Sequence, residues 1–169
     1  MAKSDSFFVR KTLNLTADNV YREAEIDLGF AIDALGKSVA RIHNVAVTFA
    51  DDNGRALEVS AQTSAAAQFQ LTTQSQVSIV TPSDKALISS GKVYGYNQLA
   101  SVNYPIISHD ADVLPQEWRN GYLVAVESLY LGAQASSTWT TDLTVSIVIE
   151  MTSETMSQAA SMALALSQQ

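Results

Sequence analysis

A two-residue alternation of apolar and polar side chains between Asp142 and Glu150 constrains the fold of this chain most strongly. Successive residues of a β-strand point to opposite faces, so the pattern predicts a strand with one face in a hydrophobic core. That face carries four apolar residues: Leu143, Val145, Ile147 and Ile149. The chain must therefore form a sheet with one covered side.

In the residues before this strand, the apolar side chains change from even to odd positions. Val124 and Val126 share one phase, whereas Leu129 and Leu131 share the other, so one regular strand cannot bury both pairs. We therefore predict a β-bulge near Glu127-Ser128. The two halves of the region, joined by a loop that is too long for a tight turn, are expected to pair as a long antiparallel hairpin.

Shorter alternating runs predict the remaining strands, and they lie at residues 26–33, 41–49, 57–59, 69–71, 76–80 and 92–97. Asp51-Asp52-Asn53-Gly54 is a turn signal, which predicts a first hairpin between the second and third of these runs. Asn120-Gly121 predicts a second turn, after a long connection that holds a helical turn at 116–119. A helix that opens at Thr16 and extends to Val39 is the rival interpretation, opposed by Gly29 and Gly36.

The two ends of the chain differ from its middle. Residues 1–25 are expected to form an N-terminal arm, in which Thr16 to Glu25 is either a short helix or a loop. Residues 26–150 form the predicted β-sandwich. Within residues 151–169 the apolar side chains recur at helical spacing, which predicts a C-terminal helix. Its expected cap is Thr152 or Ser153.

The composition favours association and excludes several functions. A chain of 169 residues is one domain, and with 16% charged residues much of its surface must be short and neutral, which packs at low cost against copies of itself. The alternative is a neutral monomer. The net charge of −7 argues against direct nucleic acid binding. Without a signal sequence the chain is expected to be made soluble in a cytoplasm, and the Asn14 acceptor motif to remain unglycosylated.

No catalytic apparatus is visible. His109, Asp110 and Asp112 form the tightest group of metal-type ligands, but they lack the spacing of a calcium loop. A G-x-S-x-G elbow and a phosphate-binding glycine loop are absent from the sequence, and His43 falls within a predicted strand. We expect neither an enzyme nor a cofactor nor a metal site.

Taken together, about eight short strands, two hairpins, long connections and no catalytic set over residues 26–150 describe an all-β antiparallel sandwich of the single jelly-roll type. With its arm and helix, the chain resembles the small single-jelly-roll major capsid proteins of tailless icosahedral, internal-membrane viruses of archaea and Thermus. The resemblance implies a virion subunit that forms oligomeric capsomers, with partner capsid proteins and a membrane within reach of its termini. A lipid layer inside the shell would also explain the acidic balance.

In this interpretation the protein works by assembly. The candidate interface residues are aromatic or belong to the termini: Phe7, Phe8, Trp118, Trp139, Met156 and Leu166. Removal of residues 1–13 is expected to leave a folded domain that fails to assemble. A carbohydrate- or receptor-binding sandwich, such as a spike or adhesin module, is the alternative, with exposed tyrosines as its sugar-binding face. A cupin-type enzyme would need more histidines than His43 and His109.

Overall fold

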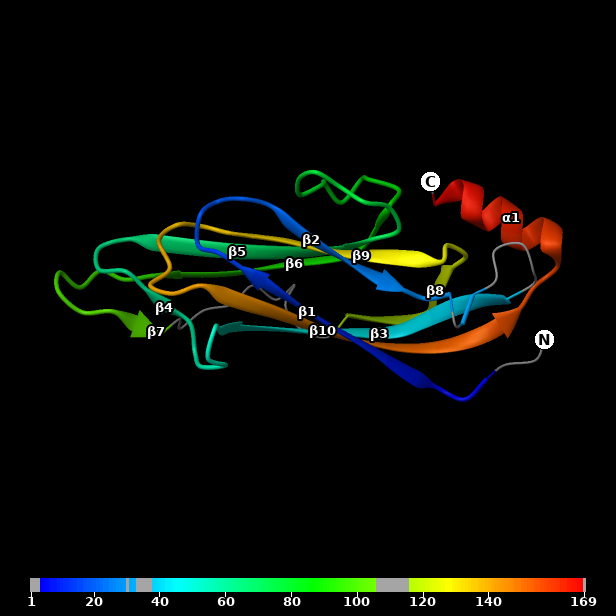
Figure 1. Cartoon of the computed structure of the whole chain (residues 1–169), viewed down its shortest axis with the longest axis horizontal. Coiled ribbons are helices and arrows are strands. Elements are labelled where there is room, and N and C mark those ends of the chain that lie inside the picture. The colour runs from blue at the N-terminus through cyan, green and yellow to red at the C-terminus, as the bar shows by residue number, and fades with distance from the viewer. Residues whose placement is uncertain (1–3, 30, 33–37, 106–115, 169) are drawn as a thin grey trace.

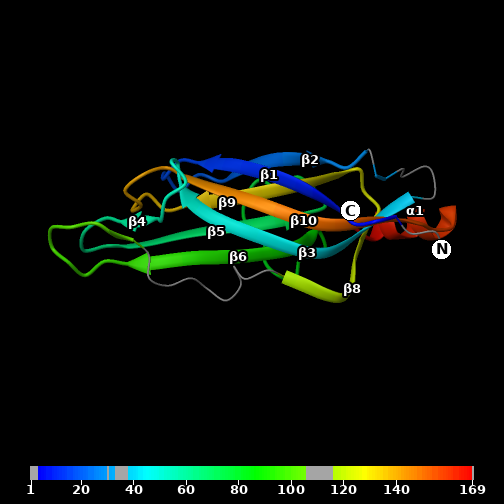
Figure 2. The same ribbon diagram turned by 90° about the horizontal axis from the view of Figure 1, so that it is seen from below.

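The computed structural model describes residues 4–29, 31–32, 38–105 and 116–168, which form two facing antiparallel sheets (Figure 1). Sheet A contains, in order, β1 (Phe7–Leu15), β10 (Leu143–Thr155), β3 (Ser38–Asp51) and β8 (Gln116–Val124). Sheet B contains, in order, β2 (Arg22–Asp27), β9 (Ser128–Ala135), β5 (Ser64–Thr72) and β6 (Leu87–Tyr96). The short strands β4 (Glu58–Val59) and β7 (Tyr104–Pro105) pair at one end, and helix α1 (Gln158–Ser167) lies at the other (Figures 1 and 2).

The eight sheet strands pair in a nested order. The first pairs with the last (β1 with β10), the second with the second-last (β2 with β9), the third with the third-last (β3 with β8), and the two central strands β5 and β6 pair with each other. A long hairpin rolled into two sheets gives this order, which is the jelly roll. The predicted all-β sandwich is therefore confirmed.

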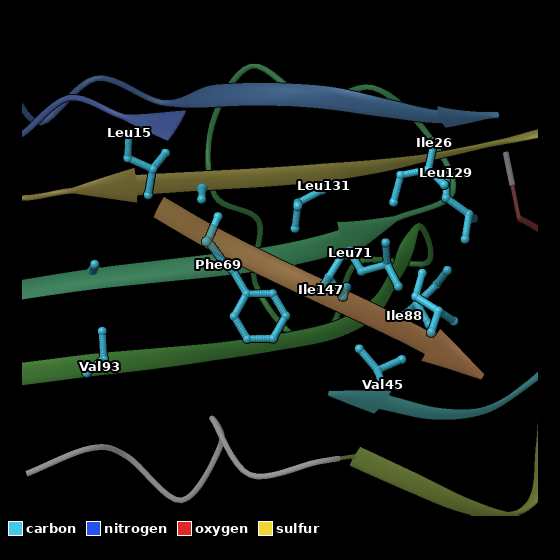
Figure 3. Packing of buried hydrophobic residues seen from close by; sticks show 14 of the residues in the cluster. Leu15, Ile26, Val45, Phe69, Leu71, Ile88, Val93, Leu129, Leu131 and Ile147 are labelled. Atoms are coloured by element: carbon cyan, nitrogen blue, oxygen red, sulfur yellow. The ribbon is translucent and has the colours of Figure 1, made fainter. Parts of the chain in front are cut away.

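The core lies between the sheets and follows the alternation in the sequence. The four apolar residues predicted for the inner face of β10 are each at most 1% exposed. They meet the inner face of sheet B, where β5 contributes Phe69 and Leu71 and β9 contributes Leu131 (Figure 3). Burial of large aliphatic side chains stabilises the fold by about 1.5–3 kcal/mol each.

The predicted long hairpin is wrong. Strands β8 and β10 belong to sheet A, but β9, which lies between them in sequence, belongs to sheet B. The predicted bulge near Glu127-Ser128 is the place where the chain crosses from one sheet to the other. Because the two sheets face one core from opposite sides, Val124 and Leu129 are both completely buried although their phases differ.

The predicted arm is also wrong for most of its length. Residues 7–15 form β1, which pairs with β10 along nine consecutive positions. Phe7, Val9 and Leu13 pack against the core and Leu15 is 1% exposed. Residues 22–27 form β2, so the alternative of a helix from Thr16 to Glu25 does not hold either. Edge strands pair on one side only, yet β1 and β2 are integral parts of the sandwich.

Several local predictions need correction. The strand expected at 26–33 ends at Asp27, and Leu28 is buried in the following turn. The turn at residues 51–54 is confirmed, with Gly54 at φ 77°, but β4 pairs with β7 and not with β3. Residues 76–80 lie in a loop, and 116–121, expected as a helical turn and a chain turn, belong to strand β8.

The C-terminal helix is present but begins later than predicted. Strand β10 continues to Thr155, so Thr152 and Ser153 cannot cap the helix. Ser157 is the cap, and its side chain accepts a hydrogen bond from the Ala160 amide. Met156 therefore precedes the helix. Helix α1 has ten residues, and in the described part of the chain no helix has the length and hydrophobicity to cross a membrane.

Candidate assembly surfaces

The outer face of sheet A, here called the sheet A face, is built from the alternate residues of β1, β10 and β3 that point away from the core. Apart from Arg10, the side chains between its two ends are short and neutral: Thr12, Asn14, Thr144, Ser146, Val148, Ala46, Thr48 and Ala50. The Thr12 and Ser146 hydroxyls share a hydrogen bond of 2.9 Å across the strands. Such short side chains lose little conformational entropy when the surface is covered.

A depression interrupts this face where β3 and β8 lose their register. His43 is an extra residue in β3, because its neighbours Ile42 and Asn44 pair with consecutive residues of β10. On the other side, Ile42 pairs with Tyr122 of β8 and Asn44 pairs with Glu117, so residues 118–121 of β8 lie opposite His43 alone. The depression is open, has a volume of about 390 Å³ and is lined by six residues: His43, Asn44, Glu117, Trp118, Arg119 and Glu150. We call it the bulge depression.

Two polar groups of the bulge depression differ in how they are satisfied. His43 Nε2 shares a hydrogen bond of 2.9 Å with the Thr152 hydroxyl, in agreement with a structural role for this histidine. Asn44 Oδ1 is buried and has no hydrogen-bond partner within the described residues. A buried acceptor without a donor costs about 1–3 kcal/mol, so this oxygen lowers the stability of the fold locally.

An ion pair fixes β8 beside this depression. Arg41 Nε and Nη2 donate to the two Glu154 carboxylate oxygens at 2.7 and 2.9 Å, and Arg41 Nη1 donates to the Asn120 carbonyl. The Glu154 carboxylate raises the pKa of Arg41, so the guanidinium stays charged. Gly121, at φ 70°, passes directly over the Arg41 side chain. The ion pair thus joins β10, β3 and β8.

The outer face of sheet B is partly covered by the loop of residues 73–86. The Gln70 side chain, which is completely buried, accepts a hydrogen bond from the Val80 amide at 2.8 Å and donates to Tyr21 Oη and the Ser78 carbonyl. Glu23 accepts from the Gln76 amide at 2.9 Å. Burial raises the pKa of the Tyr21 hydroxyl, which remains a donor to Glu23. This covered face is less suited to flat packing than the sheet A face.

An exposed apolar patch lies at the end of the sandwich that carries β4 and β7. Tyr94 and Tyr96, on the outer side of β6, are 46% and 68% exposed, and Leu99 and Val102 follow them in the next loop. The buried Asn97 side chain holds this loop by donating to the Val59 and Val102 carbonyls. The tyrosine rings are therefore presented on a fixed backbone.

At the opposite end, Gln168 anchors helix α1. Its side chain accepts from the Ala125 amide at 3.1 Å and donates to the Leu123 carbonyl at 2.6 Å, and its carbonyl accepts from the Thr73 hydroxyl at 2.7 Å. Burial raises the pKa of the neighbouring Tyr122 hydroxyl. On the helix surface, Met162 is 48% exposed.

The six predicted interface residues do not gather at one place. Phe8, on the sheet A face, and Leu166, on α1, are exposed at 54% and 69%. Phe7, Trp118 and Met156 are half-buried, and the Trp118 ring lies 6.0 Å from that of Tyr122. Trp139 is 5% exposed, and its Nε1 donates to the Ala66 carbonyl at 3.1 Å. Trp139 is therefore a core residue.

Of the residues considered for chemistry, those that the structure describes form no assembled site. His109, Asp110 and Asp112 lie outside the described residues, within which no three acidic or histidine side chains gather as metal ligands. Asp51 accepts hydrogen bonds from the Asn53 and Arg55 amides, as expected for a turn carboxylate. The bulge depression, which the sequence did not reveal, depends on a register shift that has no local sequence signature.

Comparison with known proteins gives matches in structure alone. No protein-family model matches the chain, and no curated protein matches it in sequence. Merkel cell polyomavirus VP1 in complex with disialyllactose aligns over 88% of this chain and 94% of its own, with a TM-score of 0.53 and 8% identity. VP1 of the trichodysplasia spinulosa-associated polyomavirus in complex with GM1 oligosaccharide aligns over 89% and 95%, with a TM-score of 0.51 and 8% identity. The chain thus has the jelly-roll sandwich fold of these viral capsid proteins.

Proposed function

We propose that this chain is a structural virion protein that self-assembles through oligomeric capsomers into an icosahedral shell. The observation that carries the proposal is the nested eight-strand jelly roll, which aligns with nearly the whole of the two VP1 structures. The largely neutral sheet A face supports it, because short side chains can be covered by a neighbour at little cost in entropy or desolvation.

The mechanism is closure of a symmetric assembly from many weak contacts. Following the resemblance found in the sequence, we place the protein in the virions of tailless viruses with an internal membrane that infect archaea or Thermus, beside other capsid proteins. The subunit is made in the host cytoplasm. A net charge of −7 fits a shell that does not touch nucleic acid directly. Any membrane contact of the N-terminus would use the residues before Phe7, since those after it form β1.

Size-exclusion chromatography with light scattering, followed by electron microscopy, tests the proposal. Purified protein is expected to form capsomers or closed particles as its concentration rises. A monomer at every concentration, also when the virion's other capsid proteins are added, would refute it.

A carbohydrate-binding module is the second candidate, favoured by the exposed tyrosines Tyr94 and Tyr96. Aromatic rings stack on the apolar faces of sugars, and the two VP1 structures were determined with oligosaccharides. This function predicts saturable glycan binding by an isolated subunit, which is lost in Tyr96→Ala and kept in Tyr130→Ala. A glycan array without signal for the native protein would exclude it.

A further inference from the structure

Phe8 and Arg10 form an exposed projection at one edge of the sheet A face. Both point outward from β1, the outermost strand of the sheet, and the Phe8 ring is 54% exposed. The Arg10 guanidinium carbon lies 5.7 Å from the centre of the ring. A large aromatic side chain gains by leaving water, and aromatic and arginine residues together are typical anchors of protein interfaces.

The bulge depression lies on the same face and extends from Glu150 of β10 to the opposite edge strand β8. Its charged lining consists of the carboxylates of Glu117 and Glu150 and the guanidinium of Arg119, so acidic groups outnumber basic ones. A ligand with an apolar ring and a cationic donor fits this lining. Phe8 and Arg10 of another copy have that chemistry.

The strand register relates the two features. Phe8 pairs with Glu150, Glu150 with Asn44, and Asn44 with Glu117, so these residues form one row across the four strands. At about 4.8 Å between strands, the row is about 14 Å long. A two-fold axis that runs parallel to the strands through the middle of the row exchanges its ends. Under this operation Phe8 of each copy faces Glu117 of the other.

We propose that a second copy of this chain docks on the sheet A face about such a two-fold axis. Phe8 of each copy enters the bulge depression of the other, and Arg10, one outward position further along β1, approaches the carboxylate of Glu117. The inference rests on the proposed function in self-assembly and names the surface that one of its contacts uses. An isologous contact of this kind uses the projection and the depression twice.

The middle of the face suits this arrangement. The side chains between the two edges are mostly Thr, Ser and Ala, which let two sheets approach to about 10 Å. Four strands of about nine residues cover about 600 Å² on each copy, which reaches the lower end of the range for specific interfaces. The outer face of sheet B, by contrast, is interrupted by the loop that Gln70 and Glu23 hold.

Charge reversal tests the proposal. Arg10→Glu and Glu117→Arg each place like charges opposite one another in the proposed pair and should weaken self-association at least about tenfold. An equimolar mixture of the two variants restores opposite charges at both contacts and should associate like the native protein. Lys92→Glu, which reverses an exposed cation on sheet B, is the matched control and should associate normally. The measurement is sedimentation velocity over a range of concentrations.

Circular dichroism melts show whether each variant is folded before association is measured. Native association by Arg10→Glu, or a mixture that stays as weak as its components, would overturn the proposed interface and leave assembly through other surfaces intact. A native protein that never associates would instead refute the proposed function, and the interface with it. A defect in Lys92→Glu equal to that in Arg10→Glu would show a general charge effect and would also overturn the interface.

Discussion

At the scale of single residues, Asp18 shows how one contact makes stability depend on pH. Arg22 holds both carboxylate oxygens of Asp18, with Nη1 to Oδ1 at 2.8 Å and Nη2 to Oδ2 at 2.7 Å. The hydrogen bonds from Arg22, with a second contribution from the Val20 amide, lower the pKa of Asp18 from 3.8 to about 2. The charged form is therefore favoured in the folded protein.

Because the pKa of Asp18 is lower in the folded than in the unfolded chain, the pair stabilises the fold above about pH 4. This contribution is lost as the pH falls through 2, and it is small because the pair is exposed. A titration of the Asp18 carboxyl carbon by NMR should give a midpoint near 2, and Arg22→Gln should return it toward 4. An unchanged midpoint in Arg22→Gln would contradict this account.

Two glycines with positive φ allow the cost of backbone strain to be measured apart from the cost of a steric clash. Gly54 has φ 77° and open space around it, whereas a Cβ at Gly121, φ 70°, would lie 2.5 Å from Arg41 Cγ. Gly54→Ala should cost about 1 kcal/mol, and Gly121→Ala at least about 2 kcal/mol because the Arg41–Glu154 ion pair must also move. Urea unfolding of both variants measures the difference. Equal losses would show that Gly121 is under no steric constraint.

The roles of individual aromatic residues could be predicted only in part. Phe8 was expected at an interface and is exposed, but Trp139, from the same prediction, is in the core. Composition cannot separate the two cases, because aromatic residues are enriched in cores and at interfaces alike. The sequence contains no pattern that singles out Asn44, because its unpaired oxygen lies beside a shift in strand register.

At the scale of elements, β1 determines whether the N-terminus can be removed. Deletion of residues 1–13 would remove seven of the nine β1 positions that pair with β10 and take Phe7, Val9 and Leu13 away from the core. We therefore expect an unfolded or aggregated product, the reverse of the folded domain expected from the sequence. Circular dichroism and limited proteolysis check this result, and a compact, protease-resistant product would contradict it.

Point variants in β1 provide the control for the deletion. Leu15→Ala, at a position that is 1% exposed, should cost about 2–5 kcal/mol. Thr12→Ala, on the exposed face, should change the stability by less than about 0.5 kcal/mol.

The loop of residues 73–86 depends on a glycine in the sheet beneath it. A Cβ at Gly132 would lie 1.9 Å from Tyr21 Oη, so Gly132→Ala must displace the ring that bonds Glu23 and Gln70. The Val80 amide donates a hydrogen bond to the Gln70 side chain, so its hydrogen should then exchange with solvent about tenfold faster. Hydrogen exchange measured by NMR checks this, with the β5–β9 amides as internal reference. Unchanged protection of the Val80 amide would show that the loop does not depend on the position of Tyr21.

The strands themselves were largely predictable from the sequence, but their partners were not. Alternation identified the inward residues of β10, including Ile147, and the pair Phe69 and Leu71 in β5. It reports which side of a strand faces the core and not which sheet the strand belongs to. In the sequence, the change of phase between Val124 and Leu129 therefore resembles a bulge, although it marks a crossing between sheets. In β1 the inward Lys11 hid an otherwise apolar alternation.

At the scale of the whole molecule, the nested pairing places elements from distant parts of the sequence together. Ser4 and Ser153 exchange hydrogen bonds at the end of the sandwich that carries α1 (Figure 1). Both edges of the sheet A face also come from distant segments, since β1 supplies Phe8 and β8 supplies Glu117. A surface of this kind exists only after the sandwich has closed, so assembly through it would select folded subunits.

An electron cryomicroscopy reconstruction of the assembled protein tests the central claim most directly, namely that this jelly roll is a subunit that tiles with its own copies. The account predicts a closed shell whose density fits the two four-stranded sheets and in which neighbouring subunits contact one another through their outer faces. Under conditions that yield native virions, a population of separate single chains, with no copy packed against another, would contradict it.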